Sequence, residues 1–156
     1  MAAGRVRDYR DRMRIKDVMA GKDAGEVVTI APSASVRELI TALAEHNIGA
    51  LVVSVDGVEV NGIVSERDVV RRLADGTEVL DADVASIMTA DVHVCEPGDD
   101  LDDLMRLMTH ERVRHVPVVE GARLRGLVSI GDAVKARIGE LEFERDQLNQ
   151  YVAGGQ

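Results

Sequence analysis

The sequence is poor in aromatic residues. Its 156 residues include one Phe, two Tyr and no Trp. Proteins that bind single-stranded nucleic acid need aromatic side chains on which the bases stack, so this composition argues against that class. The hydrophobic core must be built from Val, Ile, Leu, Met and Ala, and a planar ligand could not rely on stacking against aromatic side chains.

Cysteine and long hydrophobic runs are also scarce. Cys95 is the only cysteine, so no disulfide can form within the chain, and we expect a reducing, cytoplasmic location. No apolar run approaches the roughly 20 residues of a membrane-spanning helix, and no signal peptide is apparent. No ordered His/Asp group accompanies Cys95, which favours a buried thiol over a nucleophile.

Positive charge is limited as well. The chain has 19 Lys and Arg against 28 Asp and Glu, a formal net charge of -9. An acidic surface repels nucleic acids and anionic lipids, so neither is the expected partner. The exception is a basic N-terminal arm, residues 1–14, with five arginines against two aspartates. Such an arm is more often solvated or docked on protein, but nucleic-acid binding by the arm stays open as a weaker alternative.

The second half of the sequence repeats the first. Residues 18–19 match 87–88, residues 48–53 match 113–118, and residues 62–68 match 126–132. Each half also has apolar residues at positions i, i+3, i+4 and i+7, the spacing of one face of an amphipathic helix. These residues are Val36, Leu39, Ile40 and Leu43 in the first half, and Leu101, Leu104, Met105 and Met108 in the second. The chain therefore contains two copies of one supersecondary unit.

Each repeat is expected to run β-α-β-β-α. Val-rich segments predict strands at residues 27–30, 50–55 and 62–64, and again at 91–94, 113–119 and 124–128. Units of about 60 residues are marginal alone. We therefore expect an α/β (mixed α+β) fold in which repeat 1 (residues 15–76) and repeat 2 (residues 77–138) form one pseudo-two-fold module. Residues 139–156 would add an amphipathic C-terminal helix with a frayed end.

The sharpest local feature is the pattern Gly-apolar-Val-Ser-x-x-Asp at residues 62–68 and 126–132. Ser65 and Ser129 are expected to cap the helices that follow, with Asp68 and Asp132 closing capping boxes. The same geometry offers free N–H groups and the positive end of a helix dipole to a phosphate. The carboxylate one turn later can accept the hydroxyls of a ribose. The structural and the functional interpretations are compatible.

The repeated segments resemble the cystathionine-β-synthase (CBS) domain, whose tandem pairs are called Bateman modules. The likeness rests on residues 15–19, 48–53 and 62–68 with their second-half counterparts, and covers about residues 15–138. It implies a disc-like module with two clefts that bind AMP, ADP or ATP, or alternatively NAD or S-adenosylmethionine. It further implies a non-enzymatic sensor that requires no cofactor and signals to an effector protein.

The resemblance also implies roles for single residues. Asp68 and Asp132 would bind ribose hydroxyls, and Ser65 and Ser129 would bind phosphate. Arg114 stands where the first repeat has a glycine, and its guanidinium suits phosphate oxygens; pairing with a surface carboxylate is the alternative. The full set of candidate nucleotide-binding residues is Thr29, Ser65, Arg67, Asp68, His93, Arg114, His115, Ser129 and Asp132. Because the repeats differ, we expect two unequal sites.

Two patterns that suggest a metal are set aside. His110, Glu111 and His115 resemble a zinc-protease motif, but the histidines are five positions apart and do not share a helix face. The carboxylate run at residues 99–103 is more typical of a helix start, where the dipole favours acids. We therefore expect no metal site.

The tail carries an apolar seam. Its positions alternate in steps of four and three: Val134, Ile138, Leu141, Arg145, Leu148 and Val152. Two heptads are too few for an independent coiled coil. The seam is therefore expected to pack on a second subunit, giving a homodimer, or back on the module. The alternative to a nucleotide sensor is a structural or protein-interaction dimer with vestigial clefts.

Overall fold

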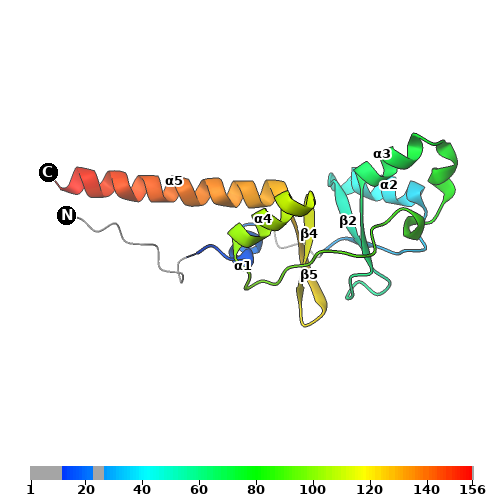
Figure 1. Ribbon diagram of the computed structural model, residues 1–156, viewed down its shortest axis with the longest axis horizontal. Coiled ribbons are helices and arrows are strands. Elements are labelled where there is room, and N and C mark those ends of the chain that lie inside the picture. The colour runs from blue at the N-terminus through cyan, green and yellow to red at the C-terminus, as the bar shows by residue number, and fades with distance from the viewer. Residues whose placement is uncertain (1–11, 23–26, 156) are drawn as a thin grey trace.

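The computed structural model describes residues 12–22 and 27–155, so most of the basic arm lies outside the described residues. The first half contains β1 (Thr29–Ile30), α2 (Val36–His46), β2 (Ala50–Val53), β3 (Gly62–Ser65) and α3 (Glu66–Leu73). The second half contains α4 (Leu101–Glu111), β4 (His115–Glu120), β5 (Arg123–Ser129) and α5 (Ile130–Gly154). Helix α1 (Ile15–Ala20) precedes the first half, and the 3₁₀ helices η2 (Thr77–Asp81) and η3 (Val84–Ser86) connect the halves (Figure 1). The mixed α+β fold of two repeats is confirmed.

The two sheets are small and unequal. Strand β2 pairs parallel with β1 and antiparallel with β3, whereas β4 and β5 form an antiparallel pair. The strand expected at residues 91–94 is wrong: only Cys95 forms a bridge, parallel to Val118. Pro117 lies opposite this segment and has no N–H to donate, so the strand pairing cannot extend.

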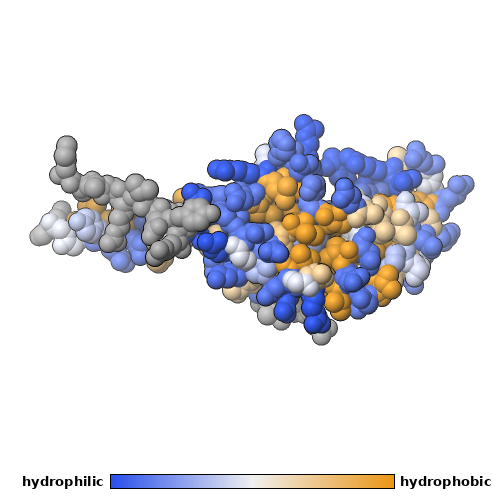
Figure 2. Space-filling view, turned by 60° about the horizontal axis from the view of Figure 1, so that its bottom comes forward, coloured by the Kyte–Doolittle hydropathy of each residue, from blue (hydrophilic) through white to orange (hydrophobic). Residues whose placement is uncertain are grey.

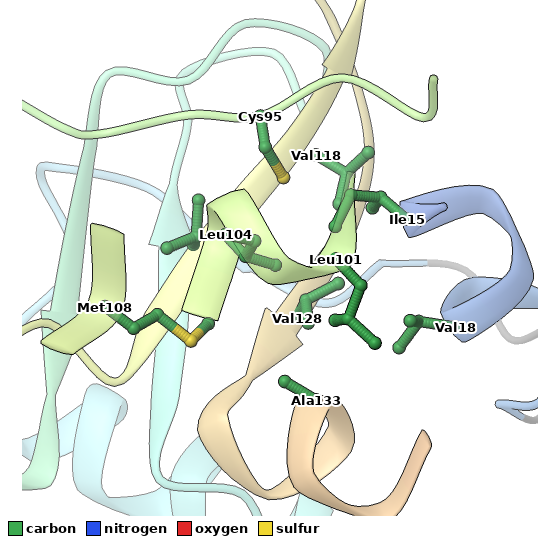
Figure 3. Packing of buried hydrophobic residues seen from close by; sticks show 10 residues of the cluster. Ile15, Val18, Cys95, Leu101, Leu104, Met108, Val118, Val128 and Ala133 are labelled. Atoms are coloured by element: carbon green, nitrogen blue, oxygen red, sulfur yellow. The ribbon is translucent and has the colours of Figure 1, made fainter. Parts of the chain in front are cut away.

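The opening segment of each half packs into the core of the other half. Ile15 and Val18 of α1 are buried among side chains of α4, β4, β5 and α5 (Figure 3). Val84 and Ile87, in and just after η3, are buried among side chains of the first half. The two halves thus exchange equivalent segments.

Equivalent backbone hydrogen bonds fix the exchange on both sides. In the second half, Leu101 N donates to Met13 O (2.9 Å) and Ile15 N to Asp99 O (2.9 Å). In the first half, Val36 N donates to Ala82 O (2.9 Å) and Val84 N to Ala34 O (2.8 Å). The same pair of contacts is therefore made twice, which is the basis of the pseudo-two-fold symmetry.

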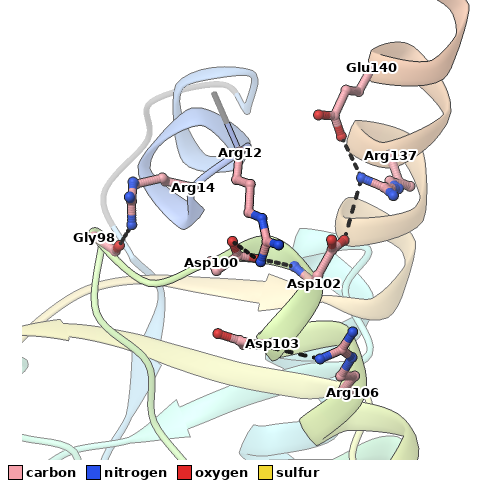
Figure 4. Close-up of polar contacts among 9 residues, drawn as sticks. All are labelled: Arg12, Arg14, Gly98, Asp100, Asp102, Asp103, Arg106, Arg137 and Glu140. Carbon is pink, nitrogen blue, oxygen red and sulfur yellow. Dashed lines mark hydrogen bonds and ion pairs between the residues drawn. The ribbon is translucent and has the colours of Figure 1, made fainter. Parts of the chain in front are cut away.

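Arginine side chains add polar contacts to the α1 side of this exchange (Figure 4). Arg14 Nη1 donates to Gly98 O at 2.7 Å, and Arg12 lies 3.8 Å from the carboxylate of Asp100. Asp100 also caps α4, because its Oδ1 accepts from Asp102 N at 2.8 Å. The interpretation of the acidic run as a helix start is confirmed.

Helix α5 is one continuous helix of 25 residues. The expected boundary between residues 138 and 139 falls inside it, and its C-terminal part projects beyond the body of the module (Figure 1). Its seam is exposed, from 41% at Val134 to 69% at Val152. The alternative in which the seam packs back on the module is therefore wrong. No helix in the described part of the chain is long and apolar enough to cross a membrane.

The glycine that opens each signature lies under a methionine of the exchanged segment. A Cβ on Gly62 would lie 2.7 Å from Met88 Sδ and 2.9 Å from the carbonyl oxygen of Thr89. A Cβ on Gly126 would lie 2.9 Å from Met19 Cε, the end of a flexible side chain. At Gly62 the added Cβ would meet backbone as well as side chain, whereas at Gly126 it would meet only the flexible end of Met19.

We expect Gly62→Ala to lower the free energy of unfolding by about 1–3 kcal/mol, because the clash involves backbone as well as side chain. Gly126→Ala should cost less, since Met19 can change rotamer. Urea denaturation of both variants would measure the difference. Equal losses would contradict the role assigned to the Thr89 carbonyl.

Candidate functional site

A cleft of about 670 Å³ lies between the two halves. The opening segment contributes Met19 and Lys22. The first half contributes Val27, Val28, Asn47, Ile48, Gly49 and Ala50. The second half contributes His115, Arg125, Gly126, Leu127, Ser129 and Asp132. The volume is in the range typical of small-molecule sites.

Ser129 and Asp132 stand at the start of α5 and form the capping box that the sequence predicts. Ser129 Oγ accepts from Asp132 N at 3.1 Å, and Ser129 N donates to Asp132 Oδ2 at 2.9 Å. Burial raises the pKa of Asp132, but hydrogen bonds from Lys22 and Ser129 outweigh it and hold the pKa below its usual value. The carboxylate is therefore ionised at neutral pH and able to accept hydrogen bonds.

His115 of the second half lines the cleft close to Gly49 of the first half. Its ring is 3.7 Å from the position that a Cβ on Gly49 would occupy. Burial lowers the pKa of His115; Asp132 and Glu66 oppose this shift, and Lys22 and Arg114 add to it. The imidazole is therefore neutral at pH 7 and can both donate and accept a hydrogen bond.

The walls of the cleft are aliphatic. Its lining includes Val27, Val28 and Ile48 of the first half and Leu127 of the second. Among the described residues, no Phe, Tyr or Trp lines the cleft. A planar ring bound here would be held between aliphatic side chains, as the composition predicts.

Thr29 and His93 do not line this cleft. Thr29 Oγ1 lies 3.9 Å from the position of a Cβ on Gly57, in the turn between β2 and β3, whereas the preceding Val28 lines the cleft. His93 is exposed and its Nε2 lies 3.7 Å from Glu111 Oε2. Their assignment to the nucleoside stays a prediction.

Ser65 and Asp68 form the equivalent capping box at α3. Asp68 Oδ2 accepts from Ser65 N (2.8 Å) and from Ser65 Oγ (3.0 Å). Arg114 is exposed and corresponds to Gly49, which lines the cleft of Ser129 and Asp132; by the same symmetry Arg114 belongs on the side of Ser65 and Asp68. A second site with Ser65, Arg67, Asp68 and Arg114 stays a prediction.

Two basic residues of the cleft were not among the sequence candidates. Lys22 follows α1, and its Nζ donates to Asp132 Oδ2 at 2.7 Å. Arg125 stands directly before the second signature, where the first repeat has Asn61. The mismatch with Asn61 was a usable signal for Arg125, whereas nothing local marked Lys22, which reaches the cleft only because α1 packs in the second half.

Cys95 is a buried thiol, as its sequence context favours. It is 5% exposed, and burial together with Asp99 raises its pKa to about 12. A protonated, inaccessible thiol is a poor nucleophile. Within the described residues no three His, Cys, Asp or Glu side chains gather in a way that could hold a metal ion.

The model of the CBS domain matches residues 15–75 and 84–139, so the chain belongs to the CBS domain family. It is 36% identical over 149 residues to the mitochondrial CBS domain-containing protein CBSX3 of Arabidopsis thaliana, covering 90% of this chain and 72% of that protein. The crystal structure of ATU1752 from Agrobacterium tumefaciens, a CBS-domain containing protein, is 45% identical, with a TM-score of 0.74. That match covers 80% of this chain and 92% of the other.

A more distant structure shares the fold. The CBS domain pair of MJ0100, crystallised with 5′-methylthioadenosine and S-adenosyl-L-methionine, is 23% identical to this chain, with a TM-score of 0.72. The match covers 83% of this chain and 98% of that pair. Tandem CBS pairs of this architecture are regulatory modules.

The lowered pKa of His115 predicts a pH effect on stability. The folded state disfavours the charged ring, so the unfolded chain binds more protons and stability falls as the pH drops below about 6.5. His115→Asn should flatten this part of the Tm profile measured between pH 5 and 8. His110→Asn, a control at an exposed position, should keep the wild-type profile; an unchanged profile in His115→Asn would contradict the assignment.

Proposed function

We propose that this protein is a non-enzymatic sensor that binds an adenine nucleotide in the cleft of Ser129 and Asp132. The observation that carries the proposal is the position of an ionised carboxylate and a capped helix start at one end of an aliphatic cleft. The carboxylate suits ribose hydroxyls, the helix start suits phosphate, and the aliphatic walls suit adenine. The fold shared with the MJ0100 pair, which was crystallised with two adenosine derivatives, supports a ligand that contains adenosine.

Signalling follows from binding between the halves. A ligand in this cleft contacts both repeats and the segment after α1, so it favours whichever arrangement of the halves fits it best. We propose that a separate effector protein reads this arrangement. The single cysteine favours a reducing compartment such as the cytoplasm, although the name of the Arabidopsis relative places that protein in mitochondria.

Thermal melts with AMP, ADP, ATP, NAD and S-adenosylmethionine test the sensor. A ligand at 100 times its Kd stabilises by about 2.7 kcal/mol, which raises the Tm by about 5–10 °C at this chain length. Asp132→Asn should lose this shift, because an amide replaces the carboxylate. The amide oxygen can still accept from Ser129 N, so the cap of α5 is kept. The matched control Asp68→Asn makes the same change at α3 and should retain binding in the Asp132 cleft.

Two results would count against the sensor. If none of the five ligands raises the Tm, the alternative of a structural or protein-interaction dimer with vestigial clefts is favoured. If Asp132→Asn keeps the full shift, the ligand binds elsewhere.

We also propose that the protein is a homodimer whose second copy covers the exposed seam of α5. The apolar stripe runs from the groove at Ile130, Val134 and Ile138, on the body of the module, to Val152 near the end of the helix, with Arg145 as its one charged position. Phe143 and Tyr151 are 63% and 83% exposed beside it. The body also exposes apolar side chains, which gather near the middle of the face shown in Figure 2. A largely apolar stripe with this spacing suits a second helix of the same kind.

The dimer is tested by sedimentation velocity. Leu141→Asp places a charge in the seam and should convert the protein to monomers at concentrations where the wild type is dimeric. Gln150→Asp adds the same charge on the opposite face of α5 and should leave the dimer intact. A monomeric wild type, or a dimeric Leu141→Asp variant, would show that the seam is not the interface.

A further inference from the structure

Lys22 connects the start of the chain to the cleft. It follows the C-terminal end of α1, and its Nζ donates to Leu127 O and to Asp132 Oδ2, both at 2.7 Å. The Asp132 side chain is 25% exposed and that of Lys22 is 41% exposed, so the ion pair is partly screened from water. These residues meet only because α1 packs in the second half.

This lysine occupies the oxygen that a ribose would use. Asp132 Oδ2 accepts from both Ser129 N and Lys22 Nζ. A carboxylate that takes both hydroxyls of a ribose needs both of its oxygens. A nucleoside can therefore bind fully to Asp132 only if Lys22 gives up its hydrogen bond to Oδ2.

The arrangement is found in one half only. Equivalent hydrogen bonds make Ile15 and Val84 corresponding positions of the two halves. At the same offset Lys22 corresponds to Asp91, which has the opposite charge. The equivalent carboxylate, Asp68, accepts from Ser65 N and Ser65 Oγ on the same oxygen. Lys22 is thus a feature of the Asp132 cleft and not of the repeat.

Two cations and one anion are found among the described residues that line the cleft. They are Lys22, Arg125 and Asp132, whereas the whole chain has a net charge of -9. A ligand that brings negative charge would balance this lining. A neutral or cationic ligand would not.

We propose that Lys22 is the specificity-determining residue of this cleft and selects phosphorylated adenosine over neutral adenosine and over cationic S-adenosylmethionine. On binding, Nζ moves from Asp132 to the phosphate, and Asp132 then accepts the ribose hydroxyls with both oxygens. The inference rests on the proposed function and names the ligand class of that site.

The selectivity depends on which partner the Lys22 ammonium has once each ligand is bound. The Lys22 side chain is 41% exposed, so an ammonium that loses its carboxylate partner there is left with the Leu127 carbonyl and solvent in place of a charged partner. A phosphate supplies a new anionic partner, and the flexible four-carbon stem of lysine allows the exchange. Adenosine supplies no such partner, so its binding to Asp132 is opposed by the existing ion pair.

Isothermal titration with AMP and with adenosine tests the inference on the full chain. The wild type should bind AMP at least tenfold more tightly than adenosine. Lys22→Met should weaken AMP by tenfold or more and should leave adenosine binding unchanged or stronger, because Asp132 is released. Lys22→Arg keeps the charge and should keep most of the preference. Lys16→Met makes the same change of charge at an exposed position of α1 and serves as the matched control.

The outcomes separate the inference from the proposed function. Wild-type protein that binds neither ligand would overturn both. Wild-type protein that binds AMP, with the AMP-to-adenosine ratio unchanged in Lys22→Met, would overturn only the role of Lys22. If Lys22→Met weakened the binding of AMP and of adenosine equally, the role of Lys22 would be structural only. A thermal melt of each variant shows whether it is folded.

Discussion

The reciprocal exchange of opening segments is the constraint on which the rest of the structure depends. The core of each half is completed by a segment from the other half. Ile15 and Val18 of α1 fill the core of the second half, and Val84 and Ile87, in and just after η3, fill the core of the first. Neither repeat can therefore be complete alone, which agrees with the marginal size of the separate units. The exchange therefore determines the lining of the cleft as well as the packing of the core. The segment that fills the core of the second half also contributes Met19 and Lys22 to the cleft.

The exchange also explains the signature glycines. In sequence, the Gly of Gly-apolar-Val-Ser-x-x-Asp reads as a strand residue with no evident function. In the structure, Gly62 and Gly126 are the points where Met88 and Met19 of the exchanged segments lie against the sheets. The serine and aspartate of the same signature cap α3 and α5. One short pattern thus fixes inter-half packing, helix start and the polar end of the cleft.

Local signals made most of the fold predictable. The 3.6-residue periodicity of α2 and α4 and the capping pairs at Ser65 and Ser129 depend on neighbours in sequence, and the structure has all of them. The failures involve partners far apart in sequence. The strand at residues 91–94 looked as good as β1, but the proline that blocks it lies in β4.

The residues of the candidate site were also found where their signal was local and missed where it was not. Ser129, Asp132 and His115 were found because they belong to repeated or mismatched motifs, and all three line the cleft. Lys22 was missed because it is 110 positions from Asp132 in the sequence, and only the exchange of segments brings the two side chains into contact. Helix α5 then links this site to the rest of the molecule. It starts in the cleft at Ser129 and Asp132, runs about 37 Å at 1.5 Å per residue, and carries the exposed seam from Val134 to Val152. If the helix rotated about its start in the cleft, Val152 would move farther than Val134, because it lies farther from that point.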